Sequence, residues 1–154
     1  MMRCPCGGSY YQKCCQPLHD FSVVATDAQR LMQSRFSAFY LKNIDYIIKT
    51  TVPAQQNLLD KSALQSWADQ TRWTNLMLIS HTPKVDKRHA QVHFKAYFYD
   101  GDKECCHDEL SSFVEVDDRW YFLDPTVPTD LTNKQPCLCG SGEKFKVCCK
   151  KFLV

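Results

Sequence analysis

Apolar residues recur at intervals of three and four residues over the first third of the chain, so residues 20–52 are predicted to be helical. Thr26 and Gln29 form a capping-box pattern at the start of the first helix. Asn43 is expected to begin a second, shorter helix, and Pro53 to mark its end. The first apolar stripe consists of Ala28, Leu31, Met32, Phe36, Phe39 and Tyr40.

A third helix is predicted at about residues 58–71, where apolar residues again share one face. These residues are Leu59, Ala63, Leu64, Trp67 and Ala68. We expect this face, like the first, to point into the core.

The period changes to two after Trp73, in runs rich in β-branched and aromatic residues. The runs are WTNLMLIS, QVHFKAYFYD, LSSFVEV and RWYFLD, separated by turn-forming residues. Helices followed by an antiparallel meander predict an α+β domain in which the helices cover one face of a curved sheet.

The chain has 154 residues, of which 44% are hydrophobic, so it can bury one sizeable core. Neither a signal peptide nor a membrane-spanning run is recognisable, which favours a cytoplasmic protein without membrane contact. Residues 134–154 carry five lysines against one glutamate, although the overall net charge is only +2. That basic tail keeps nucleic acid open as a partner.

Eight of the ten cysteines fall into two similar phrases, CPCGGSYYQKCC near the start and CLCGSGEKFKVCC near the end. A reducing compartment keeps thiols free, and local groups of four then favour a metal over disulfides. The predicted ligands are Cys4, Cys6, Cys14 and Cys15 in the first set and Cys137, Cys139, Cys148 and Cys149 in the second.

Zinc with four sulfur ligands needs neighbouring sulfurs roughly 3.8 Å apart, which a CxC turn and a vicinal pair can supply. Four thiolates leave no open coordination position, so up to two structural zinc ions are predicted. Each end is expected to be a small appendage with its own metal-dependent core. Redox-active thiols are the alternative. The first phrase is one residue shorter, which is expected to distort its site.

The C-terminal cysteine phrase resembles a known motif. CLCGSGEKFKVCC resembles the SEC-C motif, a zinc-binding tail that contacts a chaperone and the ribosome in the SecA translocase ATPase. The whole chain resembles the bacterial YchJ family, through LMQSRFSAFYLKNIDYIIKT, the Trp73 region and RWYFLD. That resemblance implies SEC-C motifs at both ends, a middle domain like nuclear transport factor two with a cone-shaped sheet, and metal roles for the eight cysteines. It implies no catalytic residue.

The predicted units are an N-terminal metal motif (1–19), an α+β domain (20–127), and a linker with the C-terminal metal motif (128–154). A cone-shaped sheet often encloses a pocket, and four polar residues are candidates to line it: His81, His93, Tyr97 and Asp124. No spacing among them specifies a reaction. Cys105, Cys106 and His107, between two predicted strands, are expected to be ordinary side chains, and Arg35 a structural one.

A non-enzymatic adaptor is the favoured function, with a protein or the ribosome as the partner of the metal motifs. Two alternatives remain open. One is small-molecule binding or catalysis in the middle pocket, and the other is RNA binding by the basic tail. In the second case Lys144, Lys146, Lys150 and Lys151 are the candidate phosphate contacts.

Overall fold

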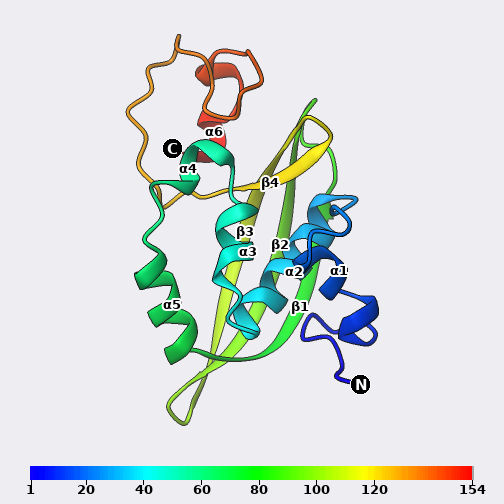
Figure 1. Cartoon of the computed structure of the whole chain (residues 1–154). Coiled ribbons are helices and arrows are strands. Elements are labelled where there is room, and N and C mark those ends of the chain that lie inside the picture. The colour runs from blue at the N-terminus through cyan, green and yellow to red at the C-terminus, as the bar shows by residue number, and fades with distance from the viewer. Residues whose placement is uncertain (154) are drawn as a thin grey trace.

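The computed structural model describes residues 1–153. Five α-helices and a short 3-10 helix precede a four-stranded sheet, and a second 3-10 helix and a sixth α-helix follow it (Figure 1). The helical elements before the sheet are η1 (Tyr11–Lys13), α1 (Gln16–His19), α2 (Ala28–Tyr40), α3 (Ile44–Lys49), α4 (Pro53–Gln56) and α5 (Lys61–Gln70). The later elements are β1 (Arg72–Thr82), β2 (His89–Asp100), β3 (Lys103–Val116), β4 (Arg119–Leu123), η2 (Phe145–Val147) and α6 (Lys150–Leu153). Within residues 1–153, no helix combines the length and hydropathy needed to cross a bilayer.

The sheet is an antiparallel meander in the order β1-β2-β3-β4. It is open, and α2 lies against its concave face (Figure 1). The α+β class predicted from the change in apolar period is therefore confirmed. On β2 the alternate positions Val92 and Ala96 are 0% and 2% exposed, as the two-residue period predicts for a strand with one covered face.

Helix α2 begins one residue later than the capping-box pattern predicts. Asp27, not Thr26, is the N-cap, and its Oδ1 accepts a hydrogen bond from the Arg30 backbone N–H at 2.8 Å. Asn43 caps α3 as predicted, through its Oδ1 and the Tyr46 backbone N–H. Pro53 begins α4 and does not mark the end of α3, since a proline fits the first turn of a helix.

Two other elements differ from prediction. In α5 only Ala68 is buried, and Trp67 on the same face is 44% exposed, because this face borders a cavity and not a filled core.

Strand β3 begins at Lys103, so Cys105, Cys106 and His107 lie within the strand and not between strands. The two-residue turn Gly101-Asp102 extends the ladder to the Asp100–Lys103 pair and places these residues opposite β2.

The core continues into both ends of the chain. One cluster of buried side chains joins Val52, Val114 and Leu123 to Phe145 and all four cysteines of the C-terminal set. At the other end, Leu18 packs with Ala38, Tyr46 and Ile47. At the C-terminal end, this packing differs from the expected separate core. Each end is short, so its apolar side chains find most of their burial against the sheet and helices.

Candidate metal centres

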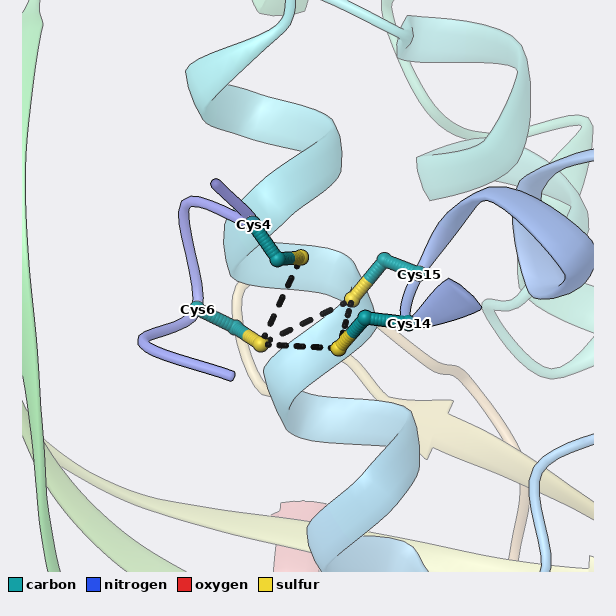
Figure 2. A group of neighbouring side chains, drawn as sticks. All are labelled: Cys4, Cys6, Cys14 and Cys15. Atoms are coloured by element: carbon teal, nitrogen blue, oxygen red, sulfur yellow. Dashed lines mark hydrogen bonds between the residues drawn. The ribbon is translucent and has the colours of Figure 1, made fainter. Parts of the chain in front are cut away.

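The N-terminal cluster consists of Cys4, Cys6, Cys14 and Cys15, whose side chains point toward one another beside α2 (Figure 2). Their sulfurs are 3.6 Å apart for Cys4–Cys6 and Cys6–Cys14, 3.8 Å for Cys6–Cys15, and 4.0 Å for Cys14–Cys15. These separations match the edge of a tetrahedron of sulfurs around zinc, roughly 3.8 Å.

The C-terminal cluster consists of Cys137, Cys139, Cys148 and Cys149, all four of them buried. The Cys148 sulfur lies 3.5 Å from that of Cys139 and 3.9 Å from that of Cys149. In both clusters all four sulfurs lie within 4.8 Å of one another, and every cysteine of residues 1–153 is free. The structure thus brings together each predicted set in an arrangement compatible with metal binding.

The two clusters have the same local fold. In each, a CxC turn with a glycine at positive φ leads to a 3-10 helix, the vicinal cysteine pair and a short α-helix. The turn is closed by a backbone hydrogen bond, from Cys4 N to Ser9 O in one and from Cys137 N to Glu143 O in the other. An aromatic ring of the 3-10 helix packs against each cluster, Tyr11 in the first and Phe145 in the second.

The missing residue of the first phrase is absorbed between Cys6 and Tyr10. Gly8 occupies the position of Ser141 and lies so close to the sulfurs that an added Cβ would stand 2.7 Å from Cys14 Sγ. The shorter turn therefore closes without separating the four sulfurs, and the expected distortion of the N-terminal site is not seen. Glycine is required here for the close approach, since even a methyl group would collide with a ligand atom.

Crowded thiols resist losing all their protons. Burial raises the pKa of both Cys14 and Cys148 to about 11. The pKa of Cys4 is lowered mainly by a hydrogen bond with Cys15, and that of Cys139 by one with Cys137. Without a cation each cluster would share protons among its sulfurs, because four thiolates at this distance repel one another. A divalent cation between the sulfurs removes that repulsion, so the donor set fits a metal.

Residues of the middle of the chain form hydrogen bonds with both clusters. Arg30, on α2, directs Nη1 at Cys15 Sγ and Nη2 at Cys14 Sγ, each at 3.4 Å. His89 Nε2, at the start of β2, lies 3.3 Å from Cys149 Sγ. Neither residue can be identified from the sequence, because each is distant in the chain from the cysteines and no spacing links them.

His89 is 1% exposed and fixed on three sides. Its Nδ1 lies 2.8 Å from Asp86 Oδ1, and its ring stacks on Phe152 of α6 with centroids 4.4 Å apart. Lys151 Nζ also bonds the Asp86 carboxylate, at 2.9 Å. Burial raises the pKa of Asp86, but hydrogen bonds from the Arg88 backbone, Lys151 and His89 outweigh it and hold that pKa below its usual value. These contacts attach the C-terminal cluster to the sheet.

The predicted phosphate contacts divide into two pairs. Lys151 is engaged with Asp86, and Lys150 donates to Asn133 Oδ1 at 2.5 Å. Lys144 and Lys146 are exposed on either side of Phe145. Only these last two present their charge outward without such a contact among residues 1–153.

Of the four predicted pocket residues, only Asp124 lines the cavity beneath α5. His93 and Tyr97 lie on the opposite face of β2 from Phe94 and Ala96, because successive strand residues alternate. His81 pairs with Val92 beyond the cavity. Other polar residues line the cavity with Asp124, among them Arg35, His107, Glu109 and Ser111. Arg35 and His107 were expected to have structural roles, and Glu109 and Ser111 have no signal in the sequence.

Two family models match the chain. The one described as "YchJ, middle NTF2-like domain" matches residues 27–125, and the SEC-C motif model matches residues 134–151. A UPF0225 protein of Actinobacillus succinogenes is 52% identical over 97% of this chain and 97% of its own. A UPF0225 protein of Haemophilus influenzae strain PittEE is 49% identical over 97% of this chain and 93% of its own.

Two solved structures are similar over most of the chain. A SEC-C motif containing protein from Psychrobacter arcticus superposes with a TM-score of 0.92 at 48% identity, over 99% of this chain and 97% of that one. One from Rhodopseudomonas palustris gives a TM-score of 0.73 at 33% identity, over 80% and 96%. The resemblance stated from the sequence motifs is confirmed.

Proposed function

The chain belongs to the YchJ-like family, with an NTF2-like middle domain and a SEC-C motif, and from this we propose that it is a non-enzymatic adaptor whose two zinc-ordered ends bind a partner. The observation that supports this proposal is the convergence of eight thiols into two closed sets of four. A closed set of thiolates holds a metal for structure, whereas a catalytic zinc keeps one position for water or substrate.

Zinc is the proposed metal because four thiolates in a tetrahedral arrangement suit zinc in proteins. Cysteines of both clusters supply the ligands. Arg30 orients and partly neutralises the thiolates of Cys14 and Cys15 from outside, and His89 holds Cys149 in position. Bound zinc would supply folding free energy to segments that are too short to order themselves.

Metal analysis of protein purified without chelator tests the zinc assignment. We expect about two zinc equivalents in the natural chain and about one after Cys14→Ser or Cys148→Ser. The control is Cys106→Ser, an exposed strand cysteine outside both clusters, which should keep two. Metal-free protein, or cluster cysteines joined as disulfides in fresh preparations, would contradict the assignment.

The proposed contact surface is the outward side of the C-terminal cluster. Phe145 is buried there, whereas Val147 on the same 3-10 helix is 63% exposed and lies between the exposed Lys146 and the buried cysteine pair. The exposed side chains of Lys144, Lys146 and Val147 form a small basic and apolar surface that the cluster holds rigid. Such a surface suits an acidic partner, and we infer a ribosomal or other protein surface.

Cosedimentation with purified ribosomes tests this partner. Lys146→Glu and Val147→Glu should each weaken binding at least several-fold without loss of zinc, because both side chains are exposed. Lys103→Glu, at the exposed start of β3, is the matched charge control and should bind like the natural chain. Equal binding by all four proteins, or none, would contradict the ribosome as partner. A loss of affinity as steep as that of a phosphate-binding protein when salt is raised would favour RNA contact instead.

A further inference from the structure

A cavity of about 300 Å³ lies between the helices and the concave face of the sheet, away from both metal clusters. Its walls are mostly apolar, with Phe36, Trp73, Phe94, Phe113 and Phe122 among them. Helix α5 covers one side through Leu64 and Trp67. The volume is at the lower end of the range for small-molecule sites.

Arg35 is a buried cation in the wall of this cavity, with only 8% of its surface exposed. Its Nη1 donates to Ile47 O at 2.9 Å and to Thr50 Oγ1 at 2.7 Å, and its guanidinium lies 4.4 Å from the centre of the Phe122 ring. These contacts fix the group in one position. Its remaining nitrogens find no hydrogen-bond acceptor among residues 1–153.

No acidic side chain of the described residues forms an ion pair with Arg35. Burial lowers the pKa of its guanidinium to about 10, in spite of the opposing influence of Tyr46, Asp124 and Glu109. A buried charge without a paired partner is costly, and a native fold retains one where something else compensates it.

Trp73 carries a donor without a partner in the wall of the cavity. It lines the cavity and is 6% exposed, and its indole Nε1 is buried without an acceptor in the described part of the chain. A buried N–H group of this kind ordinarily finds a partner, and its absence needs an explanation.

The acceptors of the cavity, in contrast, are already engaged. Glu109 takes hydrogen bonds from His107 Nε2 at 2.8 Å and from Ser111 Oγ, all three on the same face of β3. Asp124 Oδ1 accepts from the backbone N–H and the hydroxyl of Thr126. What the cavity lacks is therefore an acceptor, preferably a negatively charged one, beside the Arg35 guanidinium.

We propose that this cavity binds a small planar aromatic molecule that carries one carboxylate. The carboxylate pairs with the Arg35 guanidinium, whose planar fork suits a carboxylate, and the ring lies among the aromatic side chains. Roughly 15 non-hydrogen atoms fit a site of this volume. Glu109 and Asp124 repel a second negative charge, so monoanions are selected over dianions.

The probes are 2-naphthoate, the neutral 2-naphthylmethanol, the cation 2-naphthylmethylammonium and 2,6-naphthalenedicarboxylate, each titrated into the full chain by calorimetry. We expect 2-naphthoate to bind with a Kd on the order of 100 μM, as is usual for ligands of this size. It should bind at least tenfold more tightly than the other three probes. The ratio of 2-naphthoate to alcohol affinity is measured within one protein, so differences in stability between variants do not enter it.

Three variants locate the binding. Arg35→Met should reduce the 2-naphthoate to alcohol ratio to about one, by removing the charge while keeping the apolar stem. Ala96→Leu, which fills the cavity from β2, should abolish binding of both compounds. If Arg35→Met does not fold, Ala96→Leu still tests whether the compounds bind in this cavity. Lys95→Gln, on the opposite face of the same strand, should bind like the natural chain.

Four results would overturn the proposal. They are no binding of 2-naphthoate at 5 mM, equal binding of the alcohol, tighter binding of the ammonium compound, and unchanged binding by Ala96→Leu. The ammonium result would mean that the aromatic side chains and carboxylates form a cation site.

Discussion

Replacing Phe145 with alanine tests whether the C-terminal cluster and the sheet form one cooperative unit. The Phe145 ring is 2% exposed and belongs to the same buried cluster as Val52, Val114 and Leu123. If these side chains form one core, removing the ring must destabilise residues of the sheet as well as the metal cluster.

The magnitude follows from the burial. A phenylalanine side chain removes about 200 Å² from water, and at about 25 cal/mol per Å² this corresponds to about 5 kcal/mol. Substitutions of buried phenylalanine by alanine cost about 3 to 5 kcal/mol. We therefore expect Phe145→Ala to lower the free energy of unfolding by about 4 kcal/mol, a large share of the 5 to 15 kcal/mol typical of a domain.

Urea unfolding followed by tryptophan fluorescence is the appropriate measurement, because all three tryptophans lie at residues 67–120 and report on the middle of the chain. With a slope of about 2 kcal/mol per molar urea, the midpoint should fall by about 2 M in excess zinc. Val147→Ala, on the same 3-10 helix but exposed, should change the free energy by less than about 0.5 kcal/mol. A tryptophan midpoint that Phe145→Ala leaves unchanged, while zinc is lost, would refute the shared core.

Three further predictions concern the surroundings of the clusters. Gly8→Ala should weaken the N-terminal site alone, since its Cβ would stand 2.7 Å from a ligand sulfur. Zinc release to a coloured chelator should then become faster at the N-terminal cluster and stay unchanged at the C-terminal cluster. Unchanged release from both clusters would contradict the close approach of Gly8 to Cys14. Arg30→Met should lower zinc affinity at the same site by about 10- to 100-fold, as loss of an outer hydrogen-bond partner does. A competition titration measures this affinity, and an unchanged value would contradict the role of Arg30. Asp86 has a pKa held below its usual value, so its stabilising contribution is complete above about pH 4 and disappears as pH falls. The difference in unfolding free energy between the natural chain and Asp86→Asn should therefore shrink as pH falls from about 4 to about 2, and a constant difference would rule this out.

The fold could be predicted from sequence where one face of an element is buried against one other layer. The 3.6-residue and two-residue periods identified α2 and the alternation of β2 because burial alone determines those patterns. The same reasoning was wrong for α5, whose apolar face borders a cavity. A periodic stripe indicates that a face avoids water, and it does not show whether the space beyond it is filled.

The cysteine clusters could be predicted because their ligands are local, so spacing alone constrains the geometry. The pocket could not, because it depends on register. Val92 and Phe94 point inward, so His93 between them points outward, although His93 was predicted to line the pocket. Arg30 and His89 meet the sulfurs only through tertiary contacts, for which the sequence offers no local signal.

The continuous core sets a limit on how the chain can be divided in the laboratory. A fragment cut at the borders of the middle domain, near residues 20 and 127, would leave Val52, Val114 and Leu123 facing water where Phe145 and the C-terminal cysteines now cover them. Such a fragment should aggregate or open at that edge of the sheet, however well its borders agree with a family model. The shortest well-behaved recombinant product should therefore retain the C-terminal cysteine-rich end.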